Sequence, residues 1–296
     1  GLPEALRAPD GVGGLPSFST PEEAVRALGA VATYAQWRAR PAGHTLQPSG
    51  LDVRGARAVL AELLAGRDER ELDHAELTRL LAHYGIDLWP LRPARTLDGA
   101  QDAAAELGYP VVLKTQAPHL RHRGDLGGVA LDLRDAGELA TAYEVMSRRF
   151  GPGSEEHFAV QAMAPVGVSC VVTAIEDPSL GPVVSFGLGG VATELLDDRA
   201  YAVPPLTDTE LSDLVRSVRA APLLFGHRGT EPVDVAALED VIARLARLAD
   251  DLPEVAELAL NPVLVAPGCA SVLTAYGRLS RPDVRSDRGP RALLPG

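Results

Sequence analysis

The chain has 296 residues, of which 46% are hydrophobic and 23% are charged. This length allows one or two domains with a sizeable core, and the proportions exclude a mainly disordered chain. The formal net charge of −12 argues against a nucleic-acid partner, because any phosphate-bearing ligand must be held by a local cluster of donors against a repulsive field.

The sequence contains no apolar run near the ~20 residues that span a bilayer, and no signal peptide opens it. Its two cysteines, Cys170 and Cys269, give neither a disulfide framework nor a zinc-binding spacing, which favours reduced thiols and a cytoplasmic location. We therefore expect no membrane partner. The start at Gly1, in a Pro/Gly-rich stretch, is interpreted as that of a fragment with further domains upstream.

The first predicted element is an amphipathic helix over residues 20–38. Ser19 and Thr20 are candidate caps, and Pro21 suits a first helical position. Apolar residues follow at helical spacing, but nothing adjacent in the sequence offers a surface for them. A linker is expected next, over residues 44–50, followed by an alanine-rich helix.

From Asp73 onward, helical and strand patterns alternate, which indicates a sheet domain of the α/β or α+β type. The predicted helices span 51–66, 73–85, 98–107, 136–150, 208–220 and 235–250. The predicted strands span 86–91, 109–114, 129–133, 157–163, 169–175, 181–187, 257–266 and 270–276. The Pro/Arg-rich tail is expected to be disordered.

A lysine at the end of a predicted strand is the first candidate for chemistry. Lys114 closes the run YPVVLK just ahead of a loop with Gly127 and Gly128, so an ammonium and exposed backbone N–H groups could converge on a phosphate. A solvated lysine at a strand end is the alternative. The motifs elsewhere in the chain favour the phosphate interpretation.

Four segments carry a family resemblance, in this order: GYPVVLKTQAPHLRHRGDLGGVALDL, VQAMAPVG, IEDPSLGPVVSFGLGG and ELALNPVLV. In order and spacing they resemble the ATP-grasp region of NDP-forming acyl-CoA synthetases, relatives of the succinyl-CoA synthetase β subunit. The resemblance covers about residues 67–285. Residues 16–43 are similar to the end of the CoA-ligase region that precedes ATP-grasp in single-chain members.

The resemblance implies an α+β ATP-grasp fold in which two facing subdomains hold ATP or ADP. The implied division is 1–43 as the end of an upstream CoA-ligase-like domain, 44–66 as linker and helix, 67–160 as lid subdomain, 161–285 as nucleotide and metal subdomain, and 286–296 as tail. The implied nucleotide-site residues are Lys114, Gly127, Gly128, Gln161, Met163, Gly187, Gly189, Gly190 and Glu194. Among them, Lys114 would contact phosphate and the strand with Gln161 and Met163 would lie beside adenine. Each glycine could instead mark an ordinary turn.

His122 stands where the family places the histidine of its HKSD loop, and Asp125 matches the aspartate of that motif. The resemblance implies that His122 accepts a phosphoryl group. An imidazole can do so at neutral pH because its unperturbed pKa lies nearby. The alternative is an exposed loop histidine without a role.

The expected Mg²⁺ site departs from the family pattern. Asn261 remains, but Thr274 occupies the position of the aspartate and Tyr276 that of an arginine. Ala259 and Ser169 also replace acidic residues. A neutral hydroxyl contributes no charge to a hard cation, so we expect weakened metal binding. Acidic residues that could compensate are Glu194, Asp197 and Asp198.

Two functions remain open at this point. The first is an active synthetase half that converts ATP, a carboxylate and CoA to acyl-CoA, ADP and phosphate with the help of CoA-binding and CoA-ligase domains. The second is a catalytically weakened regulatory or ligand-sensing module, as fused to GNAT-type acetyltransferases in high-GC bacteria. The second is favoured because of the metal position. A third, weaker alternative is an interaction scaffold with an empty cleft.

Overall fold

The computed structural model describes residues 16–117, 127–190 and 195–281, and the chain divides into two compact units, 1–43 and 44–296. The first unit contains α1 (Pro21–Ala39), which confirms the predicted helix. Thr20 caps it by accepting a hydrogen bond from the Glu23 backbone N–H at 3.2 Å. None of the α1 residues is buried. Within the described ranges, we find no helix with the length and apolarity needed to cross a membrane.

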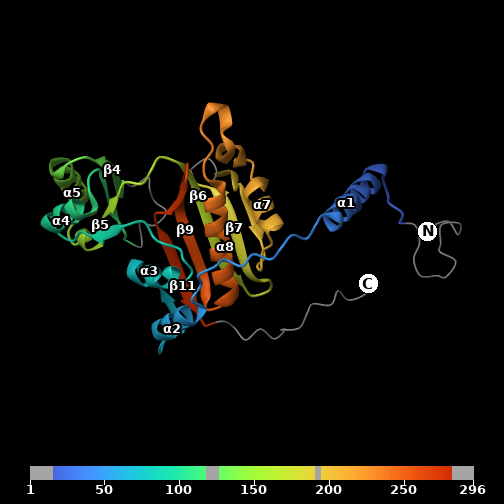
Figure 1. Cartoon of the computed structure of the whole chain (residues 1–296), viewed down its shortest axis with the longest axis horizontal. Helices are drawn as coiled ribbons and strands as arrows, with labels where there is room; N and C mark the ends of the chain where they lie inside the picture. The colour runs from blue at the N-terminus through green and yellow to red at the C-terminus, as the bar shows by residue number, and fades with distance from the viewer. Residues whose placement is uncertain (1–15, 118–126, 191–194, 282–296) are drawn as a thin grey trace. The chain divides into compact units, whose positions relative to one another are not determined.

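The second unit is built on two antiparallel sheets (Figure 1). The larger sheet has the order β1-β11-β9-β6-β7-β8, with β10 also paired to β9, and the smaller has the order β2-β5-β3-β4. The strands of the larger sheet are β1 (Glu69–Glu71), β6 (Val168–Asp177), β7 (Gly181–Leu188), β8 (Arg199–Ala202), β9 (Val255–Ala266), β10 (Cys269–Val272) and β11 (Ala275–Ser280). Those of the smaller sheet are β2 (Leu91–Pro93), β3 (Val111–Thr115), β4 (Val129–Leu133) and β5 (Phe158–Ala162). Two antiparallel sheets confirm the α+β class and exclude one continuous doubly wound sheet.

Each sheet has its own helices and its own hydrophobic core. The larger sheet is packed by α2 (Val53–Leu63), α3 (His74–Ala82), α7 (Asp208–Ser217) and α8 (Val235–Asp251). The smaller sheet is packed by α4 (Leu97–Leu107) and α5 (Ala136–Phe150). Short 3₁₀ helices cover Ser154–His157, Ala221–Phe225 and His227–Gly229.

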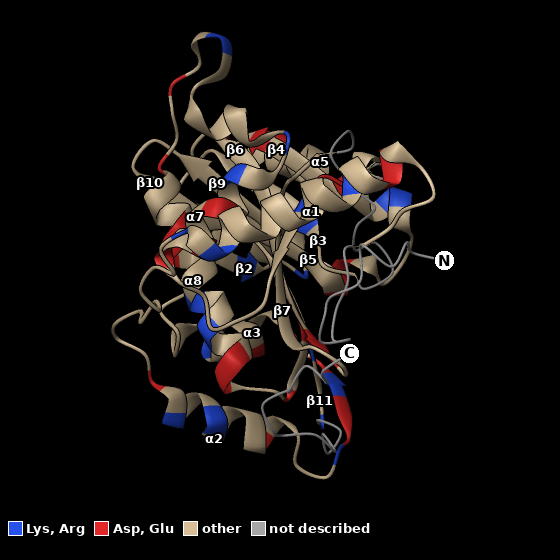
Figure 2. Cartoon of the chain, turned by 90° about the vertical axis from the view of Figure 1, so that its right-hand side faces the viewer, with Lys and Arg blue, Asp and Glu red and all other residues tan. Residues whose placement is uncertain are grey.

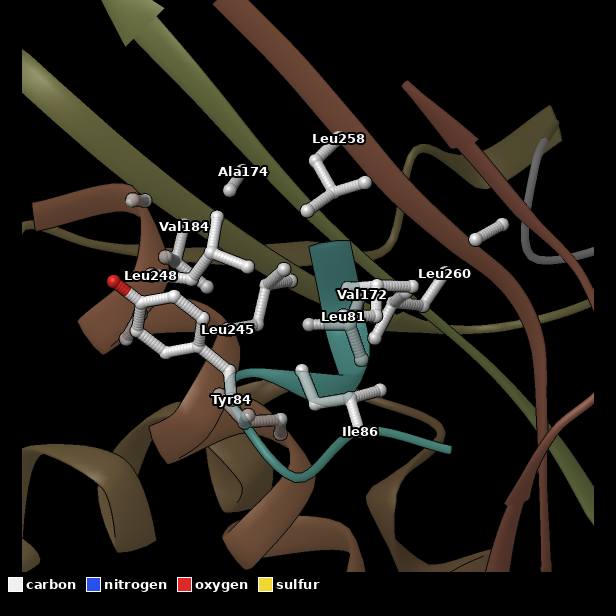
Figure 3. Close-up of a cluster of buried hydrophobic side chains, with 14 of the residues drawn as sticks. Leu81, Tyr84, Ile86, Val172, Ala174, Val184, Leu245, Leu248, Leu258 and Leu260 are labelled. Carbon is white, nitrogen blue, oxygen red and sulfur yellow. The ribbon is translucent and has the colours of Figure 1, made fainter. Parts of the chain in front are cut away.

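Residues 67–88 pack with the larger sheet rather than with the smaller one. Residues 67–88 were assigned to the lid subdomain by sequence, yet β1 pairs with β11 and α3 contributes Leu77, Leu80 and Leu81 to the core of the larger sheet. Figure 3 shows Leu81 beside side chains of the larger sheet. The apolar face of α3 packs into the core of the larger sheet, whereas the core of the smaller sheet is formed with α4 and α5.

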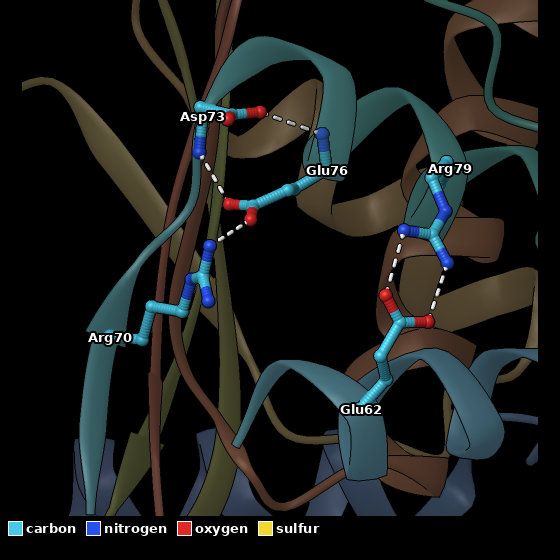
Figure 4. Close-up of polar contacts among 5 residues, drawn as sticks. All are labelled: Glu62, Arg70, Asp73, Glu76 and Arg79. Atoms are coloured by element: carbon cyan, nitrogen blue, oxygen red, sulfur yellow. Dashed lines mark hydrogen bonds and ion pairs between the residues drawn. The ribbon is translucent and has the colours of Figure 1, made fainter. Parts of the chain in front are cut away.

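Charged side chains fix the start of α3 and tie it to α2 (Figure 4). Asp73 and Glu76 form a reciprocal capping box, which satisfies two backbone N–H groups at the helix terminus. Arg70 of β1 forms an ion pair with Glu76. Arg79 of α3 pairs with Glu62 of α2 at 2.8 Å. These contacts orient α3, and so fix the position of His74 at its first turn.

One strand expected from the sequence is broken in the structure. Residues 270–276 were predicted as a single strand, but the chain forms β10 and β11 with Leu273 and Thr274 between them. The partner strand β9 contains Pro262 at this level, and proline has no backbone N–H to donate to a ladder. The Leu273 N–H still donates to the Pro262 carbonyl, and the Asn261 N–H still donates to the Thr274 carbonyl. Because Pro262 has no N–H to return, the Leu273 carbonyl accepts instead from Lys114 and Gln161 of the smaller sheet.

The core of the larger sheet gives a first testable prediction. Leu258 on β9 is fully buried among the residues of Figure 3. We expect Leu258→Ala to lower the free energy of unfolding by about 2–5 kcal/mol through lost burial and a residual cavity. Chemical denaturation measures this, with Leu180→Ala as control, because Leu180 is 59% exposed and should change stability by less than about 0.5 kcal/mol. Equal effects of the two substitutions would contradict the packing.

Candidate functional site

The candidate site is centred on Lys114, in the penultimate position of β3 in the smaller sheet. This strand is central, paired with β5 at Ala159 and with β4 at Val129. Four of its five residues are buried, so the lysine reaches its site from inside a packed strand. The lysine side chain is itself only 8% exposed.

The ammonium of Lys114 contacts three uncharged acceptors. It donates to Oε1 of Gln161 at 2.9 Å, to Oγ1 of Thr274 at 2.9 Å and to the carbonyl oxygen of Leu273 at 3.4 Å. Gln161 belongs to the smaller sheet, whereas Leu273 and Thr274 lie between β10 and β11 of the larger one. The lysine therefore joins the two halves of the second unit.

The electrostatics of this lysine are unusual for a buried charge. Within the described part of the chain, no carboxylate forms an ion pair with it, and burial lowers the pKa of Lys114 to about 8. The pKa of His74 is also lowered, first by burial and second by the positive charge of Lys114. A buried cation held only by neutral acceptors is costly. Among the described residues, the site thus has a positive charge without an acidic partner, which suits an anion.

The lysine content of the chain also points to Lys114, and the motifs alone do not reveal this signal. Of the 28 Lys and Arg residues, Lys114 is the single lysine and the other 27 are arginine; those among the described residues are blue in Figure 2. A lysine presents a compact ammonium on a flexible stem, and its pKa shifts readily on burial, whereas arginine stays charged and needs room for a planar fork. A lysine at this one position fits a site that requires the smaller cation.

The amide of Gln161 is held from three sides. Its Nε2 donates to the carbonyl oxygen of Leu273 at 2.8 Å and to that of Trp89 at 3.4 Å, while its Oε1 accepts from Lys114. The side chain is 4% exposed. The sequence placed Gln161 beside adenine with Met163. The structure directs its side chain to Lys114, and the position of this strand beside adenine stays a prediction.

Gly127 and Gly128 lie directly beside β3, the strand that contains Lys114. The Thr115 backbone N–H donates to the Gly128 carbonyl at 2.9 Å, so the pair is adjacent to Lys114. Gly127 has φ 70°, a conformation that favours glycine, and a Cβ on Gly128 would lie 2.9 Å from Cγ2 of Thr115. Gly128 thus lies next to the strand residue that follows Lys114, and the role of this glycine pair toward a phosphate stays a prediction.

The glycines that end β7 have packing reasons of their own. A Cβ on Gly187 would lie 2.9 Å from the Asp198 carbonyl oxygen, and one on Gly189 would lie 2.4 Å from Oγ of Ser169. Gly190 has φ 123°. Strand register sets Gly187 opposite Val171 of β6, close to the level of β9 where Asn261 lies. Their role toward a ligand stays a prediction.

The two positions predicted for the metal are neighbours in the structure. The Asn261 backbone N–H donates to the carbonyl oxygen of Thr274 at 2.9 Å. In the described ranges, however, no group of three or more His, Cys, Asp and Glu side chains could hold a metal ion. Asp198 is engaged elsewhere, accepting from the backbone N–H groups of Arg219 and Ala220 at 2.9 Å each. Asn261 and Thr274 themselves offer an amide oxygen and a hydroxyl oxygen but no carboxylate, so weakened Mg²⁺ binding stays a prediction.

Three predicted site residues cannot be placed. His122, Asp125 and Glu194 lie outside the described residues. Their predicted roles therefore stay predictions.

Comparison with known proteins places this geometry in a family. An ATP-grasp domain model matches residues 63–278. The chain is 34% identical over 215 residues to the β subunit of an ADP-forming acetate–CoA ligase I of Pyrococcus furiosus, covering 71% of this chain and 92% of that subunit. It is 34% identical over 255 residues to acetate–CoA ligase [ADP-forming] I of Archaeoglobus fulgidus, covering 85% of this chain and 37% of the ligase.

A solved structure agrees with these matches. An acetyl-coenzyme A synthetase 1 of Ca. Korarchaeum cryptofilum, determined in complex with coenzyme A and Ca-AMPCP, superimposes with a TM-score of 0.67 at 35% identity, over 76% of this chain and all of that one. The chain thus belongs to the ATP-grasp domain family and resembles the β subunit of ADP-forming acetyl-CoA synthetases.

Proposed function

We propose that this chain binds ATP or ADP with a phosphate group at Lys114, as the nucleotide-binding half of an acyl-CoA synthetase-type protein. The observation that carries the proposal is the buried Lys114 ammonium, held by neutral acceptors without an ion pair among the described residues. An anionic phosphate would supply the missing countercharge in a charge-assisted hydrogen bond. A buried ammonium without a countercharge lowers the stability of the fold, so such a lysine is expected to persist where function needs it.

The relatives support this choice of ligand. One structure of the Ca. Korarchaeum cryptofilum enzyme contains coenzyme A and Mg-AMPPCP, with its phosphohistidine segment pointing towards the nucleotide-binding site. His122 is our candidate for the equivalent histidine, and Asp125 for its partner. Gly127 and Gly128, beside Lys114, would contribute to covering the phosphates.

The catalytic step is proposed to be weakened. The described donors at Asn261 and Thr274 lack the carboxylate that a divalent cation requires beside a polyphosphate. A nucleotide-binding module with little turnover is suited to a regulatory or ligand-sensing role in a larger protein, such as one with a GNAT-type acetyltransferase domain. The alternative is an active half of an ADP-forming acyl-CoA synthetase, favoured by the strong similarity to such enzymes.

We further propose that α1 packs on a CoA-ligase-type domain in the complete protein. Its exposed apolar side chains support this, since Val25, Leu28, Val31, Tyr34 and Trp37 are all more than half exposed. A surface of this kind is normally covered by a partner. The Archaeoglobus fulgidus ligase, of which this chain matches 37%, has the length to contain such a domain.

Calorimetric titration with ATP and ADP, each with and without Mg²⁺, tests the proposed function. We expect binding of both nucleotides, with an affinity that Mg²⁺ changes by less than about tenfold, because Thr274 adds no charge to the metal position. Binding only in the presence of Mg²⁺ would favour the active synthetase half. Absence of any nucleotide binding would overturn the proposal and favour an interaction scaffold.

A further inference from the structure

We infer that Gln161 is a positioning residue for Lys114, whose neutral amide holds the ammonium in place without cancelling its charge. The inference deepens the proposed phosphate site and rests on it for its functional meaning. It assigns the Gln161 side chain to the phosphate end of the site rather than to adenine. The two residues lie on adjacent strands, β3 and β5 of the smaller sheet, where Lys114 and Gln161 are offset by two positions in the register.

The hydrogen bonds of the amide determine which of its atoms faces Lys114. Both donors of Nε2 are directed at carbonyl oxygens, those of Leu273 and Trp89. Oε1 is consequently the atom that remains for the lysine, at 2.9 Å from Nζ. A flipped amide would bring its NH₂ group against the ammonium and leave two carbonyls without that donor. The carbonyl groups of Leu273 and Trp89 therefore hold Oε1 of Gln161 toward Lys114.

The identity of this residue matters because a glutamate has nearly the same shape. A carboxylate 2.9 Å from Nζ would form a buried ion pair, and the lysine would then have little attraction left for a phosphate. Its negative charge would also repel the incoming anion. A glutamine oxygen accepts the hydrogen bond and adds no net charge. Thr274 and Leu273 complete the same neutral arrangement from the larger sheet.

Gln161→Glu is the discriminating variant, and the single lysine makes its effect directly observable. With ¹³C-labelled lysine, the full chain gives one Cε resonance, whose pH titration reports the protonation of Lys114. We expect its midpoint to rise well above that of the wild type, and the Kd for ADP at pH 7 to increase by about tenfold or more. A residue that merely fills the interior would move neither quantity in this way.

Trp89→Phe is the matched control. It removes the hydrogen bond from the indole Nε1 to the Ala162 carbonyl at 2.9 Å, next to Gln161, but the Trp89 carbonyl that accepts from Gln161 is retained. We expect an unchanged lysine titration and an ADP affinity within about threefold of wild type. If Trp89→Phe shifts both quantities as far as Gln161→Glu, the effect is one of general packing and the inference is wrong.

Other results of these experiments also test whether Gln161 positions Lys114. An unchanged lysine midpoint in folded Gln161→Glu would overturn the inference, whatever happens to nucleotide affinity. Should that variant not fold, Gln161→Leu takes its place, with the expectation that losing an acceptor lowers the midpoint further. If the wild type binds no nucleotide, the proposed function fails, yet the titrations of the ligand-free proteins still test whether Gln161 positions Lys114.

Discussion

Substitution of the only lysine, Lys114→Met, is expected to weaken ATP and ADP binding by about 10- to 150-fold. This loss of affinity corresponds to the removal of a charge-assisted contact of about 1.5–3 kcal/mol. Lys114→Arg is the matched control, because it keeps the charge but needs more room than the ammonium, so we expect it to retain affinity between those of wild type and Lys114→Met. Calorimetry measures all three proteins. Wild-type affinity in Lys114→Met would refute the phosphate assignment.

The same substitution should change how stability depends on pH. The lysine pKa is about 8 in the folded chain and 10.5 without its environment, so the folded state loses its proton first. The cost of burying the ammonium is then fully present below pH 8 and is relieved as the pH rises toward 10.5. Relative to Lys114→Met, the wild type should gain about 3 kcal/mol in free energy of unfolding between pH 7 and pH 10.5. If the free energy of unfolding depends on pH in the same way in both proteins, this prediction is wrong.

Restoring a carboxylate with Thr274→Asp is the second large effect that we expect. The wild type, even when supplied with CoA-binding and CoA-ligase domains, should make little or no acyl-CoA, because a threonine hydroxyl adds no charge to a divalent metal site. An aspartate at this position would lie beside Asn261, whose backbone N–H already bonds to residue 274. It would also face the Lys114 ammonium, which donates to Oγ1 of Thr274 at 2.9 Å, so without Mg²⁺ it should pair with Lys114 and weaken nucleotide binding. With Mg²⁺ present, the metal should compete with Lys114 for this carboxylate and restore nucleotide binding. Mg²⁺-dependent phosphorylation of a histidine should then appear.

Labelling with γ-labelled ATP and an acid-lability assay measures that phosphorylation. Thr274→Asn is the matched control, since it has the shape of aspartate without the charge, and it should stay unlabelled. The double variant Thr274→Asp/His122→Ala should also stay unlabelled if His122 is the acceptor. Strong labelling of the wild type would refute the proposed loss of catalysis and support the active synthetase half. Labelling that survives in the double variant would refute the assignment to His122.

Local sequence by itself determined most elements of this protein. The helix that starts at Pro21 and the helix over 136–150 have strong caps and apolar periodicity, and the structure reproduces both. The strand over 129–133 was also correct at both ends. Caps, glycines and apolar spacing act within a few residues, so they can be recognised without knowledge of the partners. Gly127 and Gly128 lie beside Lys114 because β4, which follows them directly, pairs with β3.

Only the tertiary structure decided what surrounds Lys114. Its acceptors come from Gln161 and from residues 273 and 274, which are 47 to 160 positions away in the chain. The contact depends on the break between β10 and β11, which arises opposite Pro262 on another strand and interrupts a segment that by itself predicts a continuous strand. Cross-strand pairing and burial set the charge state of this lysine, because both are properties of the assembled sheets rather than of any local pattern.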